Sequence, residues 1–196
     1  VVLHNCADPP GDGDHAGRIA QRVFEETLPW VTAVVLKERH GVTADAKRGR
    51  LLFGEKPTHK IKEHGVWYAI DLLMNQDASF YLDTRNVRRW LLDHAAGQRV
   101  LNTFAYTGSL GVAAQAGGAA KVVHTDLNRR FLNIAKTSYT LNGFTIDKKH
   151  FLASDFFPQA NRLKRANERF DCVILDPPFF SQTDHGTIDL SQDSTR

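Results

Sequence analysis

Apolar and polar positions follow a regular alternation from Asp83 onward. Short apolar runs alternate there with segments of helical spacing. The runs predict strands at 100–103, 122–125, 151–152 and 170–175, and the spacing predicts helices at about 84–97, 109–116, 129–141 and within 156–165. Either Asp83 or Thr84 is placed to cap the first helix. Strands separated by helices predict a parallel sheet, so we expect an α/β domain.

The first part of the chain has a different pattern. A helical segment at about 18–28 and a strand at 31–36 follow an apolar start at residues 1–3. Two further short runs, 51–53 and 66–70, are typical of strands in a small antiparallel sheet. The predicted organisation is therefore a small N-terminal α+β unit over residues 1–78 and an α/β domain over 79–196.

Composition is that of an ordinary globular protein. Of 196 residues, 42% are hydrophobic and 24% are charged, which excludes disordered, collagen-like and disulfide-scaffold classes. Two cysteines, Cys6 and Cys172, indicate a reducing compartment, so we expect a cytoplasmic protein. The nine histidines lack metal-site spacing, and no apolar run approaches the roughly 20 residues of a membrane span. Neither a metal nor a membrane partner is expected.

Basic residues are concentrated in one segment. The net charge of +3 is too small to indicate a nucleic-acid partner by itself. Between Lys47 and Lys62, however, six basic residues stand against one acid, Glu55. Such a segment fits a solvated surface, and it also fits a surface that contacts phosphates.

The turn after the strand at 100–103 is a candidate nucleotide site. It passes through Gly108 into a helix, where doubly wound folds bind nucleotides. Asp126 ends the next strand, and its carboxylate can accept hydrogen bonds from both ribose hydroxyls. Tyr106 stands where a dinucleotide fingerprint has its first glycine, which disfavours NAD and favours a nucleoside without phosphates, such as S-adenosylmethionine (SAM). The alternative is that Gly108 and Gly111 only allow close packing while Asp126 caps a helix.

A second candidate site follows the strand at 170–175, in the sequence Asp176-Pro177-Pro178-Phe179-Phe180. Asp176 can accept a hydrogen bond from a nucleobase, and the prolines fix the directions of their carbonyls. Phe179 can stack on a base taken out of its helix. A plain turn with Phe179 in the core is the alternative. The coincidence with the Gly108 turn and Asp126 favours a site.

These segments resemble class I SAM-dependent methyltransferases. More narrowly, the runs 65–71, 80–88 and 104–108 are similar to the bacterial 23S ribosomal RNA methyltransferases that modify cytosine C5 or guanine N7. The resemblance covers about residues 30–196 and implies a Rossmann-like sheet that is truncated after its fourth strand. The residues after Phe180 are expected to begin a helix. Such a chain is expected to be unstable or to form a homodimer through its exposed edge strand.

The resemblance also implies roles for individual residues. Asp126 would hold the SAM ribose, Asp155 would lie beside the adenine amine, and the turn would hold the methionine portion. Arg85 is a candidate partner of the SAM carboxylate, or else a solvated first-turn residue. The expected cofactor-binding set is Arg85, Asn102, Phe104, Tyr106, Thr107, Gly108, Asp126, Leu127, Asp155 and Phe156, and the expected catalytic set is Asp176, Pro177 and Phe179.

The leading functional hypothesis is methyl transfer from SAM to a base in RNA, with ribosomal RNA as the expected substrate. Neither cysteine is placed to add to a cytosine ring, so C5 chemistry is unsupported. A nitrogen acceptor needs only in-line positioning. The N-terminal unit and its basic segment would contact the RNA. Alternatives are a methyltransferase acting on DNA, protein or a small molecule, and a non-catalytic SAM- or RNA-binding fragment.

Overall fold

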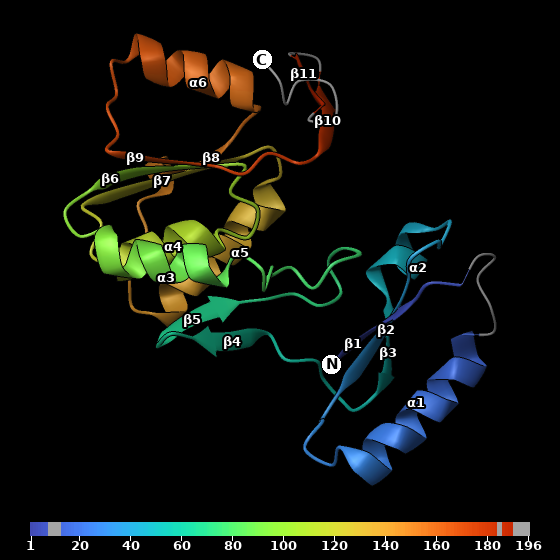
Figure 1. Cartoon of the computed structure of the whole chain (residues 1–196). Helices are drawn as coiled ribbons and strands as arrows, with labels where there is room; N and C mark the ends of the chain where they lie inside the picture. Colours follow the sequence, from blue (N-terminus) through green and yellow to red (C-terminus); the bar gives the residue numbers. More distant parts are fainter. Residues whose placement is uncertain (8–12, 184–185, 190–196) are drawn as a thin grey trace. The chain divides into compact units, whose positions relative to one another are not determined.

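The computed structural model describes residues 1–7, 13–183 and 186–189, which fall into two compact units (Figure 1). The first unit comprises Val1–Ile61 and Ile70–Tyr81, and the second comprises Lys62–Ala69 and the described part of Leu82–Arg196. The predicted boundary after residue 78 lies close to the second junction. The segment Lys62–Ala69, however, packs with the α/β unit instead of the N-terminal one.

The first unit is built on a three-stranded sheet. Its strands are ordered β1 (Val2–Asn5), β2 (Val34–Glu38) and β3 (Arg50–Phe53), with β1 and β2 parallel and β2 and β3 antiparallel. Helix α1 (Gly13–Thr27) contributes Phe24 to a core with Val31 and Val34, and a short helix α2 (Ala44–Arg48) precedes β3. The parallel pair was not predicted, because the apolar start of the chain does not reveal its partner strand.

The prediction that 51–53 and 66–70 share one antiparallel sheet is wrong. Strand β5 (Val66–Ala69) pairs instead with β4 (Lys60–Glu63) in a separate two-stranded sheet. The intervening His64 and Gly65 both have positive φ, 50° and 82°, as a two-residue hairpin turn requires. Strands joined by so tight a turn pair with each other, because closing the loop costs little chain entropy.

The prediction of a parallel sheet is confirmed in the second unit. Its strands are ordered β8 (Phe151–Ala153), β7 (Lys121–Asp126), β6 (Arg99–Thr103) and β9 (Cys172–Leu175), all parallel. Helices α3 (Arg85–His94), α4 (Ser109–Ala116) and α5 (Arg129–Leu141) cover one face, and α6 (Phe156–Arg165) lies over the other (Figure 1). A 3-10 turn, η1 (Lys148–His150), precedes β8.

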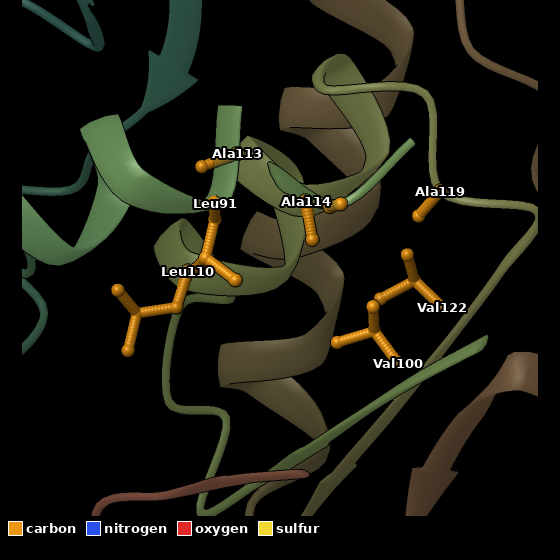
Figure 2. Close-up of a cluster of buried hydrophobic side chains, with 8 residues drawn as sticks. Leu91, Val100, Leu110, Ala113, Ala114, Ala119 and Val122 are labelled. Atoms are coloured by element: carbon orange, nitrogen blue, oxygen red, sulfur yellow. The ribbon is translucent and has the colours of Figure 1, made fainter. Parts of the chain in front are cut away.

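The core of this unit lies between α3, α4 and the sheet (Figure 2). It is formed by Leu91, Ala95, Val100, Leu110, Ala113, Ala114, Ala119 and Val122. The alanines of α4 let that helix lie close to the strands, and their burial removes apolar surface from water at about 25 cal/mol per Å². Cys172 and Ile174 of β9 pack against the same cluster, so the thiol points toward the core.

The predicted helix after Phe180 is wrong for the residues that the structure describes. These form an antiparallel hairpin of β10 (Phe180–Thr183) and β11 (Gly186–Asp189). Phenylalanine, threonine and isoleucine in these segments favour strands over a helix. The rest of the expected helix, 190–196, lies outside the described residues.

Candidate active site

The four parallel strands end at one edge of the sheet, and the predicted site segments begin there. The strand order places Asp155, Asp126, Phe104 and Asp176 in a row along this edge. Thr103 is the register partner of Leu175, so Phe104 and Asp176 leave neighbouring strands at the same level. Adjacent strands lie about 4.8 Å apart, so the ends of the outer two are roughly 14 Å apart.

The order of the strands marks a topological switch between β6 and β9. From β6 the chain moves outward to β7 and β8, and then crosses to the other side of β6 at β9. Open α/β sheets bind ligands outside the carboxyl ends of the strands at such a switch. The turn after β6 and the Asp-Pro-Pro-Phe segment after β9 are the two chain segments that flank this position.

The turn after β6 has an unusual backbone. Phe104, Tyr106 and Gly108 all have positive φ, at 49°, 49° and 80°. The two non-glycine residues each cost about 1–3 kcal/mol in this conformation, and such strain is concentrated at functional sites. The amide of Ala105 donates to the carbonyl of Thr125 at 2.9 Å, and that of Gly108 donates to the carbonyl of Ala105 at 2.7 Å. These bonds hold the turn in its strained form.

Asp126 is the polar centre of the turn. Its Oδ2 accepts a hydrogen bond from the amide of Tyr106 and its Oδ1 from the amide of Asn128, both at 2.8 Å. Burial raises the pKa of this carboxyl, and the two backbone bonds oppose that rise. A carboxylate oxygen can accept more than one hydrogen bond, so both oxygens retain capacity for ribose hydroxyls. The helix-cap alternative is wrong, because Asn128 caps α5 through the amide of Arg130.

Asp155 and the aromatic residues near it lie at the β8 end of the row. Asp155 caps α6, since its Oδ1 accepts the amide of Phe157 at 3.0 Å, which leaves Oδ2 for a ligand. The rings of Phe104 and Phe156 stack with centroids 4.8 Å apart, so the structure brings these two predicted residues together. Leu127, beside Asp126, is 65% exposed and offers an apolar surface at the same edge.

Other members of the predicted cofactor set lie deeper or elsewhere. Asn102 is buried, with its amide nitrogen 3.4 Å from Nδ1 of His124. Its side chain therefore supports the turn from below and does not reach the edge, because it points to the sheet face that carries α4 and α5. Thr107 is also buried, and the ring of Tyr106 packs edge-on against Phe131 at 4.5 Å.

Arg85 begins α3, which runs antiparallel to β6, so its first turn lies on the carboxyl-edge side of the sheet (Figure 1). The Nε of Arg85 donates to Nε2 of His64 in the hairpin turn at 3.4 Å. Of the two residues predicted to cap α3, Thr84 occupies the cap position rather than Asp83. Its hydroxyl accepts a bond from the guanidinium of Arg88 at 2.6 Å instead of a backbone amide.

Arg88 is a structural residue that the sequence pattern did not identify. It is fully buried and forms a two-pronged ion pair with Glu63 of β4 at 2.6 and 3.0 Å. This pair holds the pKa of the Glu63 carboxyl below its usual range. Arg88 shares a helix face with Leu91 and Ala95 of the core. A charged residue on the apolar face of a helix was the feature of the sequence that could have indicated a buried ion pair.

The segment after β9 presents its side chains outward. Asp176 is exposed, Pro177 is half-buried and Phe179 is 68% exposed. The alternative that places Phe179 in the core is therefore wrong. An exposed aromatic ring next to a carboxylate, at the switch position, can stack on a planar group while the acid bonds to its edge.

The two cysteines lie in different surroundings. Burial raises the pKa of the Cys172 thiol, whereas Cys6 belongs to the first unit and is exposed. Within the described ranges, no group of three or more histidine, cysteine or acidic side chains is arranged to hold a metal ion. No helix in the same ranges is both long and apolar enough to cross a membrane.

Comparison with known proteins gives consistent matches. Residues 30–196 match the family model described as S-adenosylmethionine-dependent methyltransferase. Ribosomal RNA large subunit methyltransferase I of Aeromonas salmonicida is 37% identical over 150 residues, which cover 76% of this chain and 36% of that protein. The protein of the same name from Vibrio cholerae is 35% identical over 172 residues, covering 83% of this chain and 43% of that protein.

Solved structures agree with the sequence matches. A methyltransferase complexed with SAH (S-adenosylhomocysteine) matches with a TM-score of 0.79 and 26% identity, over 94% of this chain and 48% of that one. A SAM-dependent methyltransferase from Streptococcus mutans matches with a TM-score of 0.76 and 25% identity, over 94% and 47%. The chain thus spans less than half the length of each of these proteins.

Proposed function

The chain belongs to the family of S-adenosylmethionine-dependent methyltransferases, and from that premise we propose that it transfers a methyl group from SAM to a base in large-subunit ribosomal RNA. The names of the Aeromonas salmonicida and Vibrio cholerae relatives support this substrate. The observation that carries the proposal is the row of Asp126, the Phe104–Gly108 turn and Asp176 along the carboxyl edge at the β6–β9 switch.

The residues at this edge fit SAM. The oxygens of Asp126 can take the ribose hydroxyls, and the exposed side chain of Leu127 can lie against the adenine. Asp155 uses Oδ1 to cap α6, so its Oδ2 can accept a hydrogen bond from the adenine amine beside the ring of Phe156. The strained turn that contains Tyr106 presents backbone to the methionine portion, and Arg85 is proposed to pair with its carboxylate.

The methyl acceptor is proposed to bind at the β9 end of the row. When bound, SAM supplies an electrophilic methyl group on its sulfonium. The carboxylate of Asp176 and the carbonyl of Pro177 accept hydrogen bonds from the base, while Phe179 stacks on its face. Together they hold the acceptor in line with the methyl group, which is where most of the rate enhancement arises.

Among the described residues, the site fits a nitrogen acceptor better than a carbon acceptor. Methylation at C5 of a pyrimidine needs a thiolate that adds to the ring. Cys172 packs toward the core and its pKa is raised, so it does not supply one. A nitrogen lone pair needs no such covalent partner.

Contacts with RNA are proposed for the basic segment. Its six basic residues are all exposed, as phosphate contacts require. They are Lys47, Arg48, Arg50, Lys56, Lys60 and Lys62.

Homodimer formation is proposed through β9. Among the residues that the structure describes, this strand lies at the edge of its sheet and exposes Val173 and Leu175. Sedimentation at several concentrations tests the dimer. The cytoplasmic location proposed here rests on the two free cysteines.

Calorimetric titration with SAH is the first test. Wild-type protein should bind, Asp126→Asn should lose most of the affinity, and the control Asp93→Asn, on the exposed side of α3, should bind normally. Transfer of labelled methyl from SAM to 23S rRNA should then fail in Asp176→Ala while SAH binding persists. Absence of SAH binding by folded wild-type protein would overturn the cofactor proposal.

Substrate specificity is tested with DNA, protein extract and small-molecule fractions as competing acceptors. Methyl transfer to one of these but not to rRNA would replace the proposed substrate. SAH binding without transfer to any acceptor would identify the chain as a non-catalytic binding fragment.

A further inference from the structure

A chain of buried polar side chains lies directly beneath the cofactor turn. His124 of β7 is completely buried. Its Nδ1 lies 3.4 Å from the amide nitrogen of Asn102 on β6, and its Nε2 lies 3.1 Å from the hydroxyl of Tyr139 on α5. None of these polar atoms faces solvent or enters the chemistry proposed above. The three buried side chains therefore have a role other than contact with the cofactor or the methyl acceptor.

The hydrogen bonds define the state of the ring. The amide nitrogen of Asn102 can only donate, so Nδ1 of His124 is the acceptor and Nε2 carries the proton that is donated to Tyr139. This tautomer is neutral, and both ring nitrogens are satisfied. Desolvation, with a smaller effect of His150, lowers the pKa of His124 to about 3, so the ring stays neutral at physiological pH.

The flat ring is also the point where four elements meet. It stacks on Phe151 of β8 with centroids 4.8 Å apart and planes 7° apart. A Cβ at Gly111 of α4 would collide with the ring, whereas a Cβ at Gly108 would collide with Ala135 of α5. The start of α4 therefore packs directly on His124, and the end of the turn packs on α5, the helix that carries Tyr139.

The contact between Asn102 and His124 lies close to the proposed cofactor site. Asn102 and His124 are register partners, each two residues before the site residue on its strand, Phe104 or Asp126. Asp126 in turn accepts the amide of Tyr106 in the turn. The three hydrogen-bonded side chains thus link β6, β7 and α5 just below the level where the proposed cofactor-binding residues lie.

We infer that Asn102, His124 and Tyr139 form a positioning network that holds the Phe104–Gly108 turn in register with Asp126 for cofactor binding. This inference rests on the proposed function of the turn. The network touches neither cofactor nor acceptor, and it acts by keeping a strained turn in one conformation before the ligand binds.

The test compares His124→Phe with Val122→Ala. Phenylalanine keeps the ring but loses both bonds, whereas Val122 lies on the same face of the same strand, in the core and away from the turn. Tyr139→Phe removes one hydroxyl and provides a milder variant in case His124→Phe does not fold. For each protein we would measure Tm, SAH affinity, and amide hydrogen exchange of residues 104–111 without ligand.

His124→Phe is expected to weaken SAH binding by about ten-fold and to speed exchange in the turn. Tyr139→Phe should show a smaller effect of the same kind. Val122→Ala should lower Tm without either change. Wild-type affinity and exchange in both network variants, or equal losses in Val122→Ala, would overturn the inference. If wild-type protein does not bind SAH, the proposed function fails, and the exchange data alone decide the inference.

Discussion

At the scale of one residue, the absence of a side chain at Gly111 determines how closely α4 approaches β7. A Cβ there would collide with the imidazole of His124, which is itself held at both nitrogens. We predict that Gly111→Ala lowers the free energy of unfolding by about 1–3 kcal/mol, the usual cost of overpacking. Urea denaturation measures this loss.

The matched control is Gly143→Asn. Gly143 has a positive φ of 71° and open space around its missing Cβ. Asparagine tolerates this backbone conformation, so the expected change is below about 0.5 kcal/mol. Equal losses in the two variants would show that the contact with His124 is not what limits residue 111.

The same histidine predicts a dependence of stability on pH. Its folded pKa is about 3 against 6.5 for the free side chain, because burial and the nearby His150 disfavour the charged ring. Between these two pKa values the unfolded chain binds a proton at this histidine and the folded chain does not. The free energy of unfolding is therefore highest above pH 6.5 and decreases as the pH falls toward 3. The expected slope is roughly 1.4 kcal/mol per pH unit.

Urea denaturation between about pH 7 and pH 5 tests this slope. The range avoids the titration of Glu63, whose lowered pKa affects stability only under more acidic conditions. In His124→Phe the slope should be reduced little near pH 7 and by almost the contribution of one proton near pH 5, where the unfolded histidine is nearly fully protonated. An unchanged slope in that variant would assign the acid sensitivity to other groups.

At the scale of elements, one buried ion pair joins the β4–β5 hairpin to α3. Arg88 is fully buried and Glu63 nearly so. Glu63→Gln leaves the guanidinium charge without its counter-ion, and we predict a loss of about 3–5 kcal/mol in unfolding free energy. Asp93→Asn breaks the exposed Arg89 pair on the same helix and should cost less than about 1 kcal/mol.

A double substitution separates lost charge pairing from lost packing. Glu63→Leu combined with Arg88→Met removes both charges and keeps apolar volume. It should be more stable than Glu63→Gln, because no buried charge remains unpaired. If the double variant were the less stable of the two, the ion pair itself would be the stabilising element.

The strands and helices of the second unit differ in how well the sequence predicts them. The sheet was predictable because its strands are apolar runs and its helices keep a helical period, as at Val100 and Leu91. The positions of Asp126 and Asp176 at the carboxyl edge of the sheet were predictable, because each lies at the end of such a strand. The β4–β5 pairing was not, since three of the four residues of β4 are charged and it carries no apolar run. The direction of the Asn102 side chain was not predictable, because it depends on which face of the sheet the helices cover.

At the scale of the whole molecule, the proposed cofactor and acceptor residues lie in the second unit, whereas most of the basic segment lies in the first. We therefore expect the second unit to bind the cofactor and carry out methyl transfer, and the first unit to contact phosphates of the RNA. Substitutions in the basic segment should weaken RNA binding without changing SAH affinity. The dependence of binding on salt is the measurement that separates these effects.

We predict that replacing Lys47, Arg48 and Lys56 with glutamine lowers the slope of log K against log salt by about 2, because each lost phosphate contact on a single strand contributes about 0.7. The control replaces Arg162, Lys164 and Arg165 at the exposed end of α6, which removes the same charge from the second unit. That variant should keep the wild-type slope. Equal slopes in the two variants would mean that net charge alone, and not the basic segment, attracts the RNA, since long-range attraction does not depend on where the charge is removed.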